Sequence, residues 1–345
     1  MDPVSQGVVG ALAAQATLGG RATRRVTLAG LAGGLLPDAD VVLEPLSDPA
    51  LPWELHRHFT HAFVMAPVMG LLAALPLLLL PSFRRIKGTV ILAAIVGAVT
   101  HAPLDLCTSY GTKVWWPFSM ENATLDLFPI IDPIFTLTIV ICVLVGTIKR
   151  SRKAAFVGVA FVVLYTLLAF MQRGAALEAQ EQIQKARGHT PVRSRVMPLP
   201  ASLLAWRSLY EVDGRAFADI VRPSPVGETQ MVLGDSIALL TEDDVAARAT
   251  DEARVRDVYR RFATFADHWT AWDPRDAEEG RVAVGDMRFS IDAAFRPPWA
   301  LRLGQSGAEP AVAWDMRNFA DGDMDGLLKV ILGTAPALHA VDGGN

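Results

Sequence analysis

The sequence predicts an all-α, multi-pass membrane helical bundle followed by a small α+β soluble domain. Nearly every long apolar run falls within residues 1–172, and hydrophobic residues make up 51% of the 345-residue chain. The charges divide in the same way. Residues 1–172 hold 12 basic and 10 acidic residues, a net charge of +2, whereas residues 173–345 hold 20 and 26, a net charge of −6. Neither half has the clustered basic face that nucleic-acid binding requires, so we expect no nucleic-acid partner.

The predicted membrane domain, residues 1–172, contains about four spans and two short N-terminal helices. A spanning helix needs roughly 20 apolar residues. The stretches that approach this length are residues 61–80, 89–106, 131–148 and 154–172. The two short helices are predicted at 7–20 and 26–36, and the second is too short to cross a bilayer. Asp132 followed by Pro133 is a helix-start signature for the third span.

The connections between these stretches alternate in charge. Residues 21–25, 84–87 and 149–153 are basic, whereas 37–60 and 107–130 carry acidic residues and few basic ones. The positive-inside rule places the basic connections in the cytoplasm. We therefore expect an inner-membrane protein whose acidic end and C-terminal domain lie on the outer, periplasmic side. Trp53, Trp115 and Trp116 fall at this outer end, where they can form an interfacial aromatic belt or a pocket rim.

Imidazoles and carboxylates from three distant segments converge at the same outer end. "LHRHFTH" supplies His56, His58 and His61, and "LLPDAD" supplies Asp38 and Asp40. "THAPLD" places His101 and Asp105 four residues apart, on one face of a helix. Such ligands suit zinc or a similar divalent metal, as one or two ions. Each motif alone also fits an ordinary polar pair, a turn or an interfacial histidine, but ionisable groups near a bilayer are costly and usually functional.

These motifs also carry a resemblance to a known family. "MDPVSQGVVGALAAQA", "LAGGLLPDADVV", "HRHFTHAF", "THAPLDLCTSYGTKVWWPFS" and "IIDPIFTL" occur in the order seen in the YdjM-like family of membrane-bound, metal-dependent hydrolases. "PLPASLLAWRSL" and "VAVGDMRF" resemble the C-terminal soluble extension of one branch. The resemblance implies metal ligands at Asp38 or Asp40, His56, His61, His101 and Asp105. The chain departs from the family at Gln6, where many members have His, and at His58, where Gly is frequent.

The predicted function is hydrolysis of a phosphoester or other ester by metal-activated water. We assign Asp40, His56, His61, His101 and Asp105 as metal ligands and Asp38 as general base, although the two aspartates can exchange these roles. Arg57 and Lys113 can hold a phosphate or a developing oxyanion, or can reach lipid headgroups instead. Tyr110 is a candidate donor to the substrate, and Thr60 a support for the site.

The expected partners are membrane lipids and a lipid-linked substrate, and the sequence identifies no protein partner. One alternative is a non-catalytic, metal-stabilised membrane protein whose outer domain binds a partner. A transporter is a second alternative, although transporters usually contain internal repeats and none is evident in this sequence.

The second half reads as a helix and linker over residues 173–198 and a soluble α+β domain over 199–345. Residues 206–221 predict a β-hairpin with Asp213-Gly214 at the turn. Residues 281–295 and 311–319 predict further strands, and 241–269 are helical and charged. The remaining histidines, His189, His268 and His339, lack ligand spacing.

Overall fold

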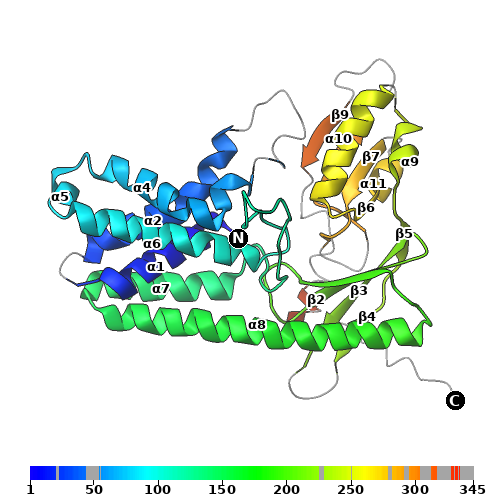
Figure 1. Cartoon of the computed structure of the whole chain (residues 1–345). Helices are drawn as coiled ribbons and strands as arrows, with labels where there is room; N and C mark the ends of the chain where they lie inside the picture. The colour runs from blue at the N-terminus through cyan, green and yellow to red at the C-terminus, as the bar shows by residue number, and fades with distance from the viewer. Residues whose placement is uncertain are drawn as a thin grey trace. The chain divides into compact units, whose positions relative to one another are not determined.

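The computed structural model divides the chain into two compact units (Figure 1). Unit 1 comprises Met1–Glu44 and Leu55–Met171, and unit 2 comprises Pro45–Glu54 and Gln172–Asn345. The structure describes residues 1–20, 23–43, 54, 56–224, 229–249, 251–278, 282–290, 295–303, 312–316, 328–329, 331–332 and 334. Trp53 and His339 lie outside the described residues.

Every helix or strand element named in the described part of unit 1 is a helix, as predicted, and one isolated β-bridge joins Thr112 to Ala123. Its elements are α1 (Pro3–Leu18), α2 (Thr23–Leu35), η1 (Leu36–Leu43), η2 (Phe59–His61), η3 (Phe63–Met65), α4 (Ala66–Leu77), α5 (Pro81–Arg84), α6 (Lys87–Leu106), α7 (Pro133–Lys149) and the first part of α8 (Arg152–Ala186). The predicted N-terminal helices correspond to α1 and α2. Asp132 caps α7 as predicted, because its Oδ1 accepts a 3.0 Å hydrogen bond from the Phe135 amide.

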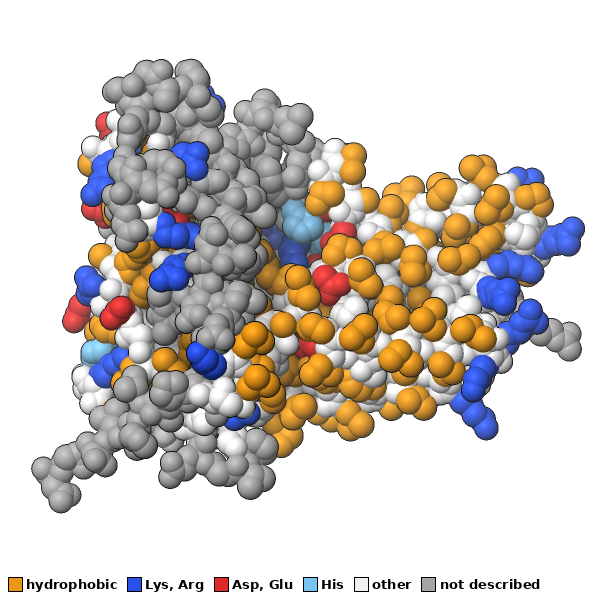
Figure 2. Space-filling model, turned by 180° about the vertical axis from the view of Figure 1, so that it is seen from behind, with side chains coloured by type: hydrophobic (Ala, Val, Ile, Leu, Met, Phe, Trp, Pro, Cys, Tyr) orange, Lys and Arg blue, Asp and Glu red, His pale blue; other side chains and the backbone are white. Residues whose placement is uncertain are grey.

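Two helices among the described residues, α6 and α8, are long and apolar enough to cross a membrane. The other two predicted spans fall on shorter apolar helices, Phe63–Leu77 and Pro133–Lys149. The outer face of α7 exposes Ile134, Leu137 and Ile141 by 60–62%. In Figure 2, Lys and Arg side chains gather at one end of this apolar surface of unit 1, and acidic and histidine side chains at the other. This distribution fits a bundle surrounded by lipid.

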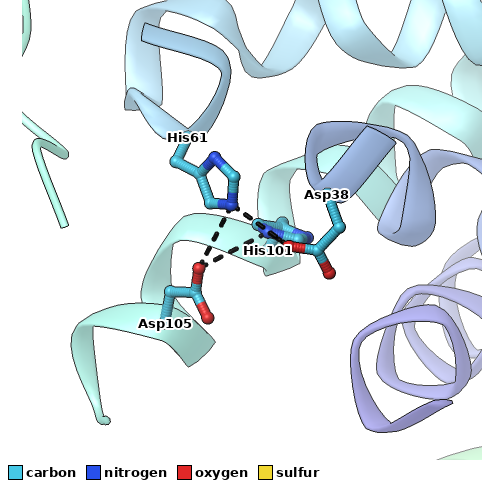
Figure 3. Close-up of side chains that lie close together, drawn as sticks. All are labelled: Asp38, His61, His101 and Asp105. Carbon is cyan, nitrogen blue, oxygen red and sulfur yellow. Dashed lines mark hydrogen bonds and ion pairs between the residues drawn. The ribbon is translucent and has the colours of Figure 1, made fainter. Parts of the chain in front are cut away.

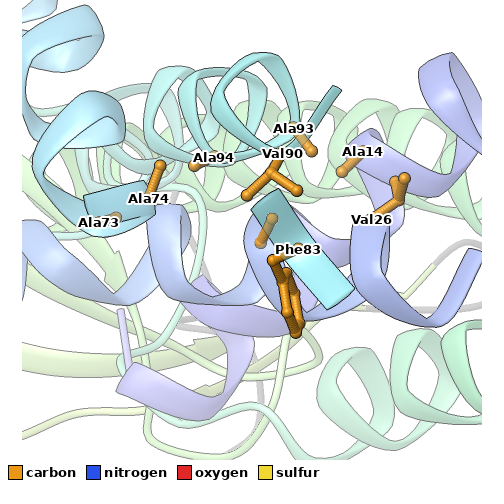
Figure 4. Close-up of a cluster of buried hydrophobic side chains, with 9 residues drawn as sticks. Ala14, Val26, Ala73, Ala74, Phe83, Val90, Ala93 and Ala94 are labelled. Carbon is orange, nitrogen blue, oxygen red and sulfur yellow. The ribbon is translucent and has the colours of Figure 1, made fainter. Parts of the chain in front are cut away.

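Small residues let the inner helices of unit 1 approach each other closely. A Cβ built on Gly97 of α6 would lie 2.1 Å from the carbonyl oxygen of Gly30 in α2, and one on Gly33 would lie 2.0 Å from the Ala94 carbonyl oxygen. The core beside this contact is rich in alanine, with Val26, Val90 and Phe83 as its larger members (Figure 4). Backbone contact of this kind is typical of helix packing in membranes. Lipid removes the hydrophobic driving force there, and small residues let the helices pack closely instead.

Helix α8 runs unbroken from unit 1 into unit 2. The predicted fourth span and the helix after it are therefore one element of 35 residues. The structure differs from the linker predicted up to residue 198, because residues 193–198 form strand β1. The end of α8 is fixed to this sheet by Gln180, whose Nε2 donates to the Arg195 carbonyl (3.0 Å) and to Ser208 Oγ (2.9 Å).

Unit 2 contains two antiparallel sheets and three short helices among its described residues. The elements are β1 (Arg193–Pro198), β2 (Trp206–Val212), β3 (Arg215–Arg222), β4 (Gln230–Val232), β5 (Ser236–Ala238), α9 (Glu242–Ala246), α10 (Glu252–Phe265), β6 (Thr270–Trp272), α11 (Pro274–Glu278), β7 (Val282–Asp286), β8 (Trp299–Leu303) and β9 (Val312–Met316). One sheet has the order β1-β2-β3-β4 with β5 also paired to β3, and the other is β6-β7-β8-β9. The predicted β2–β3 hairpin is confirmed, with positive φ at Asp213 and Gly214.

Candidate metal centre

Four side chains of unit 1 gather around one point (Figure 3). Asp38 comes from η1, His61 from η2, and His101 and Asp105 from α6. His61 Nε2 lies 3.3 Å from Asp38 Oδ1 and 3.4 Å from Asp105 Oδ2. His101 Nε2 lies 3.5 Å from each of the same two oxygens.

These four distances suit one tetrahedral metal ion. A tetrahedron with metal–ligand bonds of about 2.0–2.2 Å has ligand–ligand edges of about 3.3–3.6 Å. Two imidazole nitrogens and two carboxylate oxygens form a donor set that zinc accepts. The His/Asp cluster therefore has the donors and four edge lengths of a tetrahedral metal site.

The helix packing of unit 1 sets the direction of His101. Nδ1 of His101 lies 2.7 Å from the carbonyl oxygen of Gly34. Because a carbonyl only accepts, Nδ1 carries the proton and Nε2 keeps its lone pair for the centre. The contact lies one helical turn beyond the Gly30–Gly97 approach, so the small residues of α2 and α6 position this histidine.

A hydroxyl and a carboxylate fix His61 in the same way. Thr60 Oγ1 donates to Asp40 Oδ2 at 2.7 Å and lies 2.9 Å from His61 Nδ1. Since the single hydroxyl proton of Thr60 is used on Asp40, Thr60 accepts from His61 Nδ1–H. The Nε2 lone pair of His61 consequently faces the centre, as in metal sites where an outer carboxylate orients a ligating imidazole.

Several atoms that face the centre lack a hydrogen bond. Among the described residues, His101 Nε2 and Asp105 Oδ2 are buried without a hydrogen-bond partner. Two imidazole lone pairs opposite two carboxylate oxygens repel one another unless a cation or protons lie between them. Buried polar atoms without a partner are rare in folded proteins, and a bound ion can satisfy them. The residues present therefore fit a bound metal.

The second oxygen of Asp105 is held by donors from distant parts of unit 1. Oδ1 accepts from the Met1 amino group at 2.5 Å and from Gln6 Nε2 at 2.8 Å, and Arg57 Nη2 lies 3.5 Å away. These donors leave Oδ2 for the two histidines. Gln6 had no assigned role in the sequence, although a buried amide in an apolar helix is itself a sign of function.

A second possible metal group consists of Asp40, His56 and His61. His56 Nδ1 lies 2.9 Å from Asp40 Oδ1, and His61 Nδ1 lies 3.4 Å from Asp40 Oδ2. The structure thus places Asp38 in the four-donor cluster, where the sequence assigned Asp40, and places Asp40 behind His61. His61 offers a different nitrogen to each group. Since its Nδ1 proton is donated to Thr60, we interpret this second group as support for the first.

The two aspartates of η1 are held in the ionised form by the histidines around them. Burial raises the pKa of Asp38, but the His101 and His61 rings beside it outweigh this effect and leave its pKa below the ordinary value. The pKa of Asp40 is lowered in the same sense, because the neighbouring His56 and His61 rings outweigh its burial. Ionised carboxylates are the form that binds metal.

The predicted cation Arg57 lies directly beside the centre. It is 9% exposed, adopts a positive φ of 61°, and donates from Nη1 to Thr108 Oγ1 at 2.9 Å. Its guanidinium stacks on the predicted donor Tyr110, 4.9 Å from the ring centroid. Lys113 is joined to it through the backbone, since the Lys113 amide donates to the Arg57 carbonyl at 3.1 Å. All three residues predicted to act on the substrate therefore come from one connected region.

Some features of this centre could not be predicted from the types of side chain in the sequence. The Gly34 carbonyl that orients His101 belongs to the backbone, and only the surrounding run of small residues indicates a close approach. His58 contributes to neither metal group; its ring lies 6.3 Å from that of Trp116. In unit 2, His189 Nδ1 lies 3.2 Å from the Tyr210 hydroxyl.

Comparison with known proteins bears on the first half of the chain. Neither the curated proteins nor the solved structures give a significant match. The family model described as YdjM inner membrane protein matches residues 1–176, which span unit 1 and the complete His/Asp cluster. The match covers just over half of the 345 residues. The resemblance predicted from the sequence is confirmed, and the chain belongs to the YdjM inner membrane protein family.

Proposed function

We propose that the protein is a metal-dependent hydrolase of the inner membrane that cleaves a phosphoester or other ester of a membrane-associated substrate. The observation that carries this proposal is the four-donor cluster of Asp38, His61, His101 and Asp105, with edges of 3.3–3.5 Å. Zinc is the proposed metal, because imidazole and carboxylate ligands at tetrahedral spacing suit it. A zinc ion bound here would lower the pKa of a coordinated water towards about 7 and so supply hydroxide at neutral pH.

The aspartates and histidines of the site divide the remaining work between them. His61, His101, Asp105 and Oδ1 of Asp38 would hold the ion. The second oxygen of Asp38, Oδ2, has no hydrogen-bond partner among the described residues, so it can accept a proton from a water on the ion, which keeps the predicted role of base. His56, one third exposed, is oriented by Asp40 and can return a proton to the leaving oxygen.

Arg57 and Tyr110 supply the groups for a developing negative charge. The Nε of Arg57 is buried without a hydrogen-bond partner among the described residues. A guanidinium in a site shielded from water stabilises a phosphate or oxyanion far more than an exposed cation does. We also propose that this end of unit 1, together with unit 2, lies on the outer side of the membrane, because the basic connections lie at the opposite end.

The test is metal analysis of the full chain purified in detergent. We expect wild type to retain zinc and His101→Ala to lose it, with His189→Ala of unit 2 as the matched control that keeps it. Wild type and His189→Ala should hydrolyse bis(p-nitrophenyl) phosphate or a p-nitrophenyl carboxylic ester, and His101→Ala should not. The proposal would be contradicted if wild type purified without chelator contained no zinc and did not bind zinc that is added to it.

One observation favours a second candidate, a metal-stabilised membrane protein without catalysis. Structural zinc sites have four protein ligands, whereas catalytic sites keep a position open, and here four donors already surround the centre. The two candidates differ in one measurement. Zinc that is retained by wild type, with no ester hydrolysis and with loss of folding in His101→Ala, would favour the structural role.

A further inference from the structure

The segment between Val114 and Leu125 presents unusually exposed aromatic and apolar side chains. Phe118 is 87% exposed, Met120 58% and Trp115 52%. Glu121 is the only charged residue in this segment. Large exposed apolar groups in one cluster indicate an interaction surface rather than ordinary scatter.

This segment continues the apolar surface of the membrane helices on both sides. The Trp115 ring lies 5.2 Å from that of Phe63, where the apolar helix Phe63–Leu77 begins. That helix exposes Val64 by 51% and Val68 by 45%. In the other direction the chain leads to Ile131 and Ile134, each about 60% exposed at the start of α7. The exposed side chains of this segment therefore adjoin the exposed apolar surface of these two helices.

The backbone of the segment is tied to the metal centre at two points. The Lys113 amide donates to the Arg57 carbonyl at 3.1 Å, and the Phe63 amide donates to the Val114 carbonyl at 3.0 Å. The residues between Arg57 and Phe63 include His61. A further contact joins Trp116 to Phe59, with ring centroids 6.0 Å apart.

We infer that Trp115, Phe118 and Met120 form a lipid-inserting wedge, whose partner is the acyl-chain region of the bilayer at the metal-centre end of unit 1. Aromatic side chains on such a loop enter the boundary between headgroups and acyl chains. Because the wedge directly follows Lys113 and Val114, whose backbones are hydrogen-bonded to Arg57 and Phe63 on either side of His61, a lipid beside it would bring its ester-bearing headgroup towards the cluster. Insertion of the wedge does not depend on the proposed function. Its consequence, that the substrate is an ester-bearing lipid that enters from the bilayer, rests on the proposed function.

Insertion can be measured without any activity. Phe118→Trp is reconstituted in phosphatidylcholine vesicles that contain lipid brominated on the acyl chains, and its fluorescence is compared with that of wild type. Leu164→Trp, on the apolar face of α8, is the positive control, and Val192→Trp, on the surface of unit 2, is the negative control. We expect the tryptophan added at 118 to be quenched as strongly as that at 164. Quenching no greater than at 192 would overturn the wedge, whatever the protein hydrolyses.

The consequence for substrate class is tested with two esters. A long-chain fluorescent phosphodiester lipid is presented in vesicles, and bis(p-nitrophenyl) phosphate is presented in solution. Phe118→Ser should lower kcat/KM for the lipid about tenfold, as expected for the loss of one buried aromatic side chain, and leave that for the soluble ester unchanged. Equal losses on both esters, or none on the lipid, would contradict lipid entry at the wedge while leaving the hydrolase proposal standing. Unchanged zinc content shows that the variant is folded.

Discussion

At the scale of single residues, hydroxyl and carbonyl groups behind the histidines decide whether the cluster can bind metal. Thr60 makes the clearest case, because its hydroxyl bridges His61 and Asp40. We expect Thr60→Val to weaken zinc affinity roughly 10–100-fold, as removal of groups behind metal ligands usually does. Competition with a chelating dye measures the change.

Thr138→Val is the matched control, because the Thr138 hydroxyl bonds only to the Ile134 carbonyl within α7 among the described residues. It should bind zinc as tightly as wild type. If both valine variants bind alike, the hydroxyl of Thr60 does not orient His61.

The two aspartates of η1 give a second prediction. Asp38 Oδ1 faces the centre, whereas Asp40 lies behind His61. Asp38→Ala should therefore lose a direct ligand and most of its zinc, while Asp40→Ala should still fill with zinc at high concentration, at about 10–100-fold lower affinity. Titration followed by elemental analysis distinguishes the two variants, and the reverse order would restore the assignment made from the sequence.

The choice between Asp38 and Asp40 shows how far the sequence could predict this site. The spacing of His101 and Asp105 specified one helix face, and the membrane topology brought the other candidates to the same depth. Asp38 and Asp40 lie two residues apart in a 3₁₀ segment, where three residues make one turn and the two side chains point in different directions. Only tertiary packing determines that choice.

At the scale of elements, the close contact of α2 and α6 positions His101. Gly97→Ala would place a methyl group 2.1 Å from the Gly30 carbonyl oxygen. Because backbone cannot yield as a flexible side chain does, the helices must separate. We expect a loss of about 1–3 kcal/mol of stability and lower zinc affinity. Thermal unfolding in detergent and zinc titration measure the two effects.

Gly88→Ala, on the same helix, provides the comparison. No heavy atom lies within 4 Å of the Cβ that it would add, so it should be neutral or slightly stabilising, since alanine favours helix over glycine. Equal effects of the two alanines would mean that helix propensity, rather than the contact with α2, governs the result.

Element boundaries were harder to predict than element types. The apolar runs located α1, α2, α6 and α7, but they ended the fourth span near residue 172, where polarity rises. Helix α8 continues to Ala186 because its polar second part packs on a sheet, for example Ala179 and Ile183 against Val221. A change of surroundings from lipid to protein alters the composition of a helix without ending it.

At the scale of the whole molecule, the charge pattern of unit 1 predicts its orientation. Lys and Arg side chains gather at one end of the apolar surface of unit 1, and acidic and histidine side chains at the other (Figure 2). Since α8 leads from the basic end towards unit 2, a C-terminal fusion should be active with a reporter that works only in the periplasm. Activity of a cytoplasm-specific reporter would reverse the proposed topology and place the cluster at the inner surface.

Metal removal connects the site to the stability of unit 1. In the cluster, imidazole lone pairs face carboxylate oxygens, and these groups repel one another unless a cation or protons lie between them. Removal of the metal by a chelator should therefore destabilise unit 1. Zinc at one hundred times its dissociation constant adds about 2.7 kcal/mol to folding. For a unit of this size that corresponds to a rise of about 5–10 °C in Tm.

Calorimetry of the full chain in detergent, with zinc or with chelator, measures this shift. Within the described residues of unit 2 there is no comparable ligand cluster, so a transition that belongs to unit 2 should stay in place while that of unit 1 moves. His101→Ala should unfold at one temperature in both solutions, because it has lost a ligand whose Nε2 faces the centre. A shift of equal size in His101→Ala would mean that zinc acts elsewhere on the protein, and the cluster would then have no part in its stability.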